Sequence, residues 1–120
     1  MNFSGNIIFL GCENLTEIKT FYNEFLALDI YKDQGRCLIF TLPGGNYLGF
    51  CDHLKKKASS KSPIITLLCE DKEGVDEAYN KFQEEDLPIA KAPATNEDFA
   101  IYHFFTEDPA GYTVEIQCFL

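Results

Sequence analysis

The sequence predicts an α+β fold: two tandem βαβββ modules that form a curved, mostly antiparallel eight-stranded sheet with helices on the outside. The first observation is an internal repeat, because Ile7–Glu13 returns 57 residues later as Ile64–Glu70. Nine of the 24 aligned positions, 7–30 against 64–87, are identical. A solenoid needs about three or more repeats to bury a continuous core. Two copies within 120 residues therefore predict one domain with a pseudo-two-fold axis.

The second observation is that both copies have the same predicted order of strand, helix and three strands. In the first module, residues 5–52, Asn14 offers a helix N-cap and the apolar residues that follow recur at helical spacing, which predicts a helix over 15–27. Short apolar runs separated by turn residues predict the strands. These strands are Ile7–Cys12, Ile30–Asp33, Arg36–Leu42 and Tyr47–Cys51, with a turn at 43–46.

The second module, residues 62–119, follows a lysine-rich stretch without aromatic residues that reads as a linker over about 52–63. Asp71 is the expected helix cap, and Val75, Tyr79 and Phe82 form the apolar stripe. The predicted strands are Ile64–Cys69, Pro88–Ala92 at an edge, Ile101–Thr106 and Tyr112–Phe119.

Composition excludes several classes of partner. The net charge of −9 disfavours nucleic acid and anionic membranes, although it allows a cationic ligand. No segment approaches the roughly 20 apolar residues of a membrane span, and no signal-peptide pattern is visible. The five cysteines are an odd number without CxxC pairing, which favours reduced, buried thiols in a cytoplasmic protein.

Strand alternation separates the residues that face the helices from those that face a cleft between the modules. If Glu115 faces the cleft, so do Thr113 and Gln117, whereas the alternate residues of that strand lie under the helix. By the same reasoning Ile8, Leu10, Ile65 and Leu67 lie under the helices. The cleft face mixes aromatic, apolar and a few polar groups, as small-molecule pockets do.

Two candidates for catalysis stand out. Glu115 could be a metal ligand, a general base or an anchor for a cationic group, or else a carboxylate paired with Lys or Tyr at the cleft mouth. His103 could be a base or a hydrogen-bonded structural residue, and His53 is expected to be solvated. Cys51 could point into the cleft, but no histidine is at a reliable distance to activate it. The expected ligand-binding residues are Phe9, Tyr47, Cys51, Thr66, Thr113 and Glu115.

Three features together resemble the vicinal oxygen chelate superfamily, which contains glyoxalase I, bleomycin-resistance proteins and extradiol dioxygenases. The first helix contains Asn14-Leu15, then Phe21-Tyr22, then Phe25-Leu26-Ala27-Leu28. Near its C-terminus the chain contains Asp108-Pro109-Ala110-Gly111-Tyr112-Thr113-Val114-Glu115, close to the family's Asp-Pro-x-Gly-x-x-x-Glu ending. The third feature is the repeat itself.

The resemblance also implies where a metal would bind. In the family's metalloenzymes the first and last strands of each module supply His, Gln or Glu ligands. Carried over to this chain, these positions fall on Ile7, Gly49, Ile64 and Glu115. Only Glu115 can ligate a metal, so the expectation is a site without metal or other cofactor.

The resemblance therefore implies a soluble small-molecule-binding protein of the bleomycin-resistance type, forming a homodimer like many relatives. The first alternative is a metal-dependent glyoxalase-like lyase or isomerase, or a dioxygenase-like enzyme, with Glu115 and His103 at its centre. The second alternative is an interaction module without a ligand.

Overall fold

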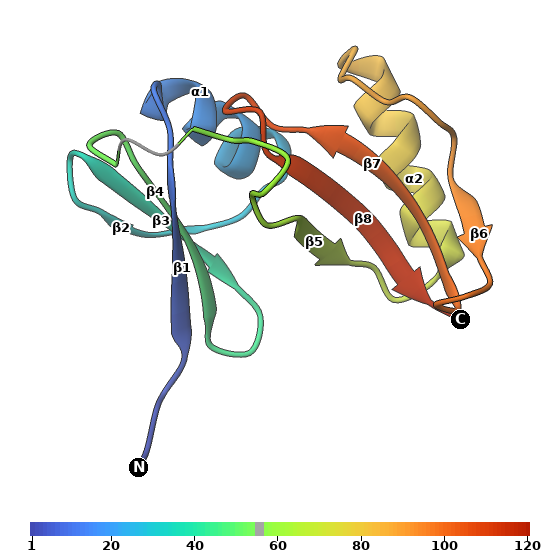
Figure 1. Ribbon diagram of the computed structural model, residues 1–120, viewed down its shortest axis with the longest axis horizontal. Coiled ribbons are helices and arrows are strands. Elements are labelled where there is room, and N and C mark those ends of the chain that lie inside the picture. The colour runs from blue at the N-terminus through green and yellow to red at the C-terminus, as the bar shows by residue number, and fades with distance from the viewer. Residues whose placement is uncertain (55–56) are drawn as a thin grey trace. The chain divides into compact units, whose positions relative to one another are not determined.

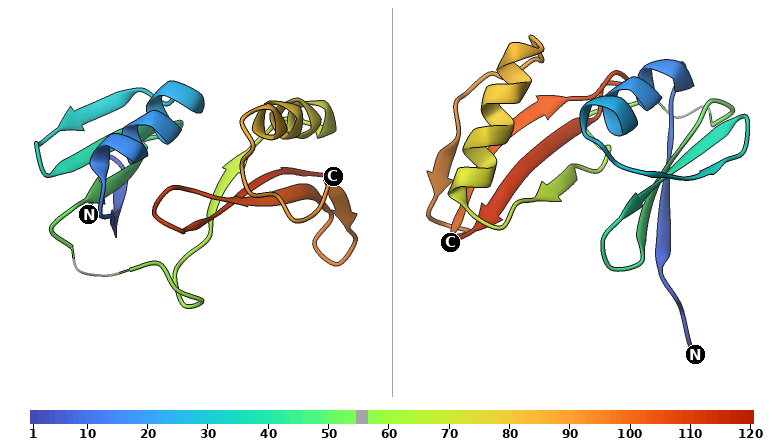
Figure 2. Two further views of the ribbon diagram at one scale, coloured as in Figure 1. Left: turned by 90° about the horizontal axis from the view of Figure 1, so that it is seen from above. Right: turned by 180° about the vertical axis from the view of Figure 1, so that it is seen from behind.

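The computed structural model describes residues 1–54 and 57–120, so Lys55 and Lys56 of the predicted linker lie outside the described residues. The chain divides into two compact modules, residues 1–59 and 60–120. Each module is a four-stranded sheet with its helix packed on one face (Figures 1 and 2). The predicted α+β class and the duplicated βαβββ order are confirmed, with the eight strands in two sheets of four.

The first sheet has the strand order β1-β4-β3-β2. Its outer strand β1 runs parallel to β4, and the other two pairings are antiparallel. The strands are β1 (Asn6–Gly11), β2 (Ile30–Asp33), β3 (Cys37–Leu42) and β4 (Asn46–Cys51). The tight β3–β4 hairpin places Leu42 opposite Asn46 and Cys37 opposite Cys51.

The helix of the first module changes its winding halfway. The α-helix α1 (Leu15–Lys19) begins at Asn14, whose side chain accepts a hydrogen bond from the backbone N–H of Glu17 at 3.1 Å. A π-helical segment, η1 (Thr20–Phe25), continues it. Phe21 and Tyr22 of this segment are both buried, and the Tyr22 ring packs against Phe40 and Phe50 of the sheet.

The second sheet repeats the topology with the order β5-β8-β7-β6. Again the first strand pairs in parallel with the last, and the other pairings are antiparallel. The elements are β5 (Ile65–Leu68), α2 (Lys72–Glu84), β6 (Ala94–Asn96), β7 (Ile101–Glu107) and β8 (Thr113–Phe119). Asp71 caps α2 by accepting from the N–H of Gly74 at 2.9 Å, as predicted.

One predicted strand lies at the wrong place. Pro88–Ala92 is not a strand, and the edge strand β6 starts only at Ala94. The reason is that Pro88 and Pro93 have no N–H to give to a ladder, so pairing begins immediately after the second proline.

The helix-facing residues form a core in each module, with two exceptions. Val114, Ile116 and Cys118 of β8 are buried, and Phe104 of β7 packs edge-on against Tyr79 and Phe82 of α2. Leu67, however, is only half-buried.

Ile8 is the second exception, because it is 51% exposed although it was expected under a helix. The short helix α1 packs mainly on β3 and β4, so the start of the outer strand β1 is exposed, whereas Leu10 near its end is buried. None of the helices in residues 1–54 and 57–120 has the length and apolar character that crossing a bilayer requires.

Candidate ligand-binding site

Four polar side chains meet on the face of the second sheet that points away from α2. Register explains the meeting: Thr66 of β5 and Phe105 of β7 lie directly opposite Glu115 on either side of β8. His103 pairs with Gln117 in the same antiparallel ladder, two residues before Phe105 on β7 and two residues after Glu115 on β8. Because alternate residues share a face, Thr66, His103, Glu115 and Gln117 project together.

Glu115 is the centre of this cluster. It is 8% exposed, and its two carboxylate oxygens have different partners. Oε1 accepts from the Thr66 hydroxyl at 2.7 Å and from the Gln117 amide at 3.1 Å. Oε2 lies 2.6 Å from Nδ1 of His103. A buried carboxylate needs such partners, and the expectation of a Lys or Tyr partner is replaced by His, Thr and Gln.

The short contact between His103 and Glu115 assigns the imidazole proton. Two acceptors at 2.6 Å repel unless a hydrogen lies between them, and an ionised carboxylate only accepts. Nδ1–H therefore donates to Oε2. In the neutral imidazole Nε2 is then an acceptor, and within the described residues it has no hydrogen-bond partner.

Gln117 is incompletely satisfied. Its amide nitrogen donates to Glu115, so the amide oxygen is directed away from the carboxylate. Among the described residues Oε1 of Gln117 is one of two buried side-chain polar atoms without a partner. Such an orphan costs about 1–3 kcal/mol. This one unpartnered oxygen therefore lowers stability, which is common where polar groups serve a function.

Apolar side chains surround the polar cluster. Phe105 packs edge-on against the His103 ring, with centroids 5.0 Å apart, and is 42% exposed. Leu68, on the same face of β5 as Thr66, and Ile64, immediately before the strand, are also exposed. Thr113, a predicted ligand-binding residue, is half-buried on β8 two residues before Glu115. A few fixed polar groups among exposed apolar ones are the usual composition of a small-molecule site.

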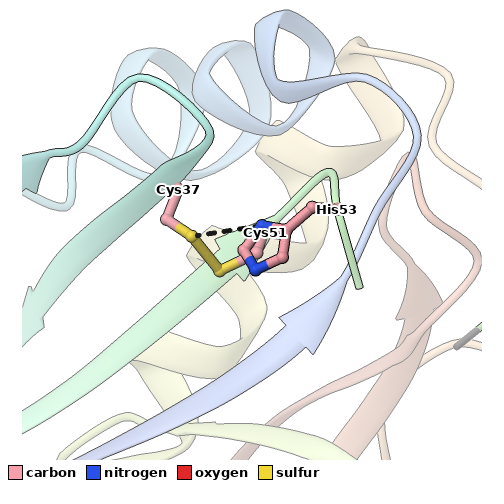
Figure 3. Close-up of side chains that lie close together, drawn as sticks. All are labelled: Cys37, Cys51 and His53. Atoms are coloured by element: carbon pink, nitrogen blue, oxygen red, sulfur yellow. Dashed lines mark hydrogen bonds between the residues drawn. A yellow bond between two sulfur atoms is a disulfide. The ribbon is translucent and has the colours of Figure 1, made fainter. Parts of the chain in front are cut away.

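The other predicted ligand-binding residues belong to the first module. Phe9 of β1 and Tyr47 of β4 lie on the sheet face opposite the helix, and Tyr47 packs against Tyr31 with ring centroids 4.4 Å apart. Cys51 is joined to Cys37 in a disulfide across the β3–β4 hairpin (Figure 3). The prediction of five reduced cysteines is therefore wrong for this pair, and Cys51 has no free thiol. Cys12, Cys69 and Cys118 are not part of a disulfide.

Sequence reasoning did not pair Cys37 with Cys51, although the signal was there. Cys37 lies near the start of the predicted strand before the turn at 43–46, and Cys51 ends the strand after it. Counting outward from the turn places them opposite each other. His53 is exposed as expected, but its Nδ1 lies 4.0 Å from Sγ of Cys37.

The residues at the family's metal positions do not fit a metal ion. Ile7, Gly49 and Ile64 offer no ligand atom, and Glu115 already uses both carboxylate oxygens. At Gly49 the space for a ligand side chain is filled, because a Cβ there would lie 2.6 Å from two carbons of the Phe9 ring.

Comparison with known proteins agrees with this fold. The family model "Glyoxalase/Bleomycin resistance protein/Dioxygenase superfamily" matches residues 6–116. Among solved structures, a glyoxalase/dioxygenase from Nostoc punctiforme has a TM-score of 0.80 at 19% identity, covering 95% of this chain and 89% of its own. A lactoylglutathione lyase from Agrobacterium tumefaciens has a TM-score of 0.74 at 22% identity, covering 93% and 90%. A search of curated proteins gives no match.

A third solved structure, a glyoxalase/bleomycin resistance protein/dioxygenase from Nocardioides, covers 100% of this chain and 85% of its own with a TM-score of 0.78 at 15% identity. These identities are low, so the solved structures support the fold alone. The family model spans nearly the whole chain, and the chain belongs to the glyoxalase/bleomycin resistance/dioxygenase superfamily.

Proposed function

We propose that this protein binds a small organic molecule, without a metal ion, on the sheet face around Glu115 and His103. The observation that carries the proposal is the 2.6 Å pair itself, because a neutral His103 that donates through Nδ1 has Nε2 as a hydrogen-bond acceptor beside exposed apolar side chains. Burial of ligand surface on Phe105 and Leu68 would supply affinity at about 25 cal/mol per Å².

The electrostatics favour a cationic N–H donor, such as an amine or guanidine on an aromatic or aliphatic body. A neutral His103 hydrogen-bonded to an ionised Glu115 carries a net charge of −1, and the whole chain carries −9. The ligand's N–H would donate to Nε2, while the carboxylate behind the ring would stabilise its positive charge.

A thermal-shift screen tests this proposal, since a molecule that binds only the native state raises the melting temperature. Hits should be amines or guanidines, and carboxylate analogues of the same body should give no shift. Glu115→Gln should remove the shifts, whereas Glu107→Gln, an exposed carboxylate on the same sheet, should keep them. Hits that are anionic, or that keep their shift in Glu115→Gln, would contradict the proposal.

A second candidate function is proton transfer on the bound molecule, as in a glyoxalase-like lyase or isomerase. The same pair favours it, because a carboxylate that orients a neutral imidazole makes Nε2 a usable base. Hits from the screen can be incubated in deuterium oxide and followed by proton NMR. Exchange of a ligand C–H that is lost in His103→Gln would support catalysis, and no exchange would leave binding as the function.

The proposal includes a cytoplasmic location and a homodimer. Three of the five cysteines are not in a disulfide, which favours a reducing compartment, and there the Cys37–Cys51 disulfide would form only under oxidising conditions. Ile7, Ile8 and Phe9 are all exposed on β1, which is an outer strand, and exposed apolar outer strands tend to pair with another chain. Sedimentation should give a dimer for the wild type and a monomer for Ile8→Lys. Phe99→Lys, at an exposed turn, is the matched control and should stay dimeric.

A further inference from the structure

A second group of side chains with metal-binding chemistry lies in the first module, on residues that the proposed function does not use. Cys37, Cys51 and His53 bring two sulfurs and a ring nitrogen within 4.8 Å of one another (Figure 3). Within residues 1–54 and 57–120 this is the one group of three or more His, Cys, Asp or Glu side chains with that geometry. The position differs from that of the family's metal ligands, which would fall on Gly49 in this strand.

We propose that the reduced form of this protein binds one Zn²⁺ through Cys37, Cys51 and His53, and that formation of the Cys37–Cys51 disulfide abolishes the site. The two thiolates and the imidazole would be three protein ligands, with water at the fourth position. The disulfide and the metal thus compete for the same two sulfur atoms.

The backbone already holds the ligands in place. Cys37 and Cys51 are a directly opposed pair in the β3–β4 hairpin, with Cα atoms 4.1 Å apart. Hydrogen bonds extend the ladder past the pair, because the N–H of Asp52 donates to the carbonyl of Arg36 at 3.0 Å. The Arg36–Asp52 ion pair at 2.8 Å joins the same two strand ends. The sulfurs therefore stay on one face when the bond between them is broken.

The distances require only small movements. Zinc–sulfur bonds of about 2.3 Å and zinc–nitrogen bonds of about 2.0–2.1 Å in a tetrahedron place the two sulfurs about 3.8 Å apart and sulfur and nitrogen about 3.6 Å apart. Nδ1 of His53 is 4.0 Å from Sγ of Cys37. After reduction, rotation about the cysteine side-chain bonds can separate the sulfurs without moving the strands.

Burial also fits a metal site with access from one side. Cys37 is 9% exposed and Cys51 is 3% exposed, which protects the thiolates, whereas His53 is exposed and can approach a metal from solvent. Thiolate sulfur and imidazole nitrogen are the ligands that Zn²⁺ prefers. An exposed histidine directly after the strand would also give the metal a path of entry.

The chemistry balances in two steps. A dithiol reductant transfers two electrons and two protons to the disulfide, so that the S–S bond breaks, two cysteine thiols form and the reductant becomes a cyclic disulfide. Zn²⁺ then replaces the two thiol protons, which are released to solvent, and the neutral imidazole adds its lone pair.

The test uses tag-free full-length protein, reduced with a dithiol that is removed by gel filtration without oxygen. Titration with Co²⁺ should produce the sulfur-to-cobalt charge-transfer absorption at one equivalent, and Zn²⁺ should bleach it. Oxidised protein should give no such band. Circular dichroism before and after reduction shows whether the reduced chain stays folded.

Variants separate this site from the others. Cys37→Ser should abolish the band, and His53→Ala, at an exposed position that folding does not need, should weaken Zn²⁺ binding at least tenfold. Cys69→Ser, a half-buried thiol of the second module, is the matched control and should bind as the wild type does. The proposal is wrong if reduced protein binds no Co²⁺ or unfolds, if oxidised protein binds equally well, or if His53→Ala leaves the affinity unchanged.

Discussion

Nδ1 of His103 on β7 lies 2.6 Å from Oε2 of Glu115 on the neighbouring strand β8. The contact joins the two side chains of the second sheet that are best suited to proton transfer, and it determines the tautomer of the histidine. Whether Nε2 donates or accepts a hydrogen bond is therefore expected to decide which ligands bind, rather than direct contact between the ligand and the carboxylate.

The first prediction concerns that tautomer. In Glu115→Gln the new amide can keep its oxygen toward Thr66 and Gln117, so its NH₂ group faces Nδ1 of His103. Nδ1 must then accept, which moves the proton to Nε2 and turns the outer atom into a donor. Nitrogen-15 NMR of the imidazole should show the Nδ1–H form in wild type and the Nε2–H form in the variant. The same tautomer in both proteins would contradict the assigned hydrogen bond.

The second prediction concerns the cores of the two modules. Leu10 is 8% exposed on β1, whereas Leu67, its repeat-related residue on β5, is only half-buried. Leu10→Ala should cost roughly 2–5 kcal/mol of unfolding free energy, and Leu67→Ala should cost less than Leu10→Ala. Urea unfolding of both variants measures the two losses of unfolding free energy. Equal losses would show that the burial of the leucine does not determine the cost.

The third prediction is a pH dependence at the second helix. The Tyr102 hydroxyl donates to Asp76 on α2 at 2.6 Å, and this hydrogen bond is the main reason that the pKa of Tyr102 is raised above its ordinary value of 10.0. A raised folded-state pKa stabilises the fold fully below the unfolded-state pKa, and the contribution is lost as pH rises through the folded-state value. Stability should therefore fall above about pH 10 more in wild type than in Tyr102→Phe. Urea unfolding from pH 8 to 11 checks this, and parallel curves would contradict it.

The fourth prediction concerns the turn before β8. Asp108 is 5% exposed, and its carboxylate accepts from the N–H groups of Ala110 and Tyr112 at 2.9 and 3.0 Å. Asp108→Ala should cost roughly 1–3 kcal/mol, because buried donors lose their partner. Glu107→Ala, at the exposed neighbouring residue, is the control and should change stability by less than about 0.5 kcal/mol. Similar costs for both variants would show that the turn does not depend on the carboxylate.

The fold was predictable because the repeat and the local patterns agree. Strand β2 was expected at Ile30–Asp33 and lies there, between the end of the first helix and the turn before β3. The edge strand of the second module was predicted too early in the sequence. Pairing at an edge starts at a residue that has an N–H to donate, and the two prolines shift that start to β6. The exposure of Ile8 was missed because helix length, not strand alternation, decides how much of a sheet is covered.

The site was only partly predictable. Alternation placed Thr66, Thr113 and Glu115 on one face, but the pairing of His103 with Glu115 depends on the register of β7 against β8. That register follows from the length and geometry of the connecting turn, which the sequence pattern does not give to the nearest residue. The Cys37–Cys51 bond was missed although its hairpin was predicted, because the odd number of cysteines and the lack of CxxC spacing favour reduced thiols.

The ring of Phe9 over Gly49 has a consequence for engineering a metal site into the first module. A histidine or glutamate placed at position 49 would bring its Cβ 2.6 Å from that ring, so the ring would have to move. Phe9 is 45% exposed, and a smaller side chain at position 9 would remove the clash. A ligand at position 49 is therefore best introduced together with a substitution at position 9, as a double variant.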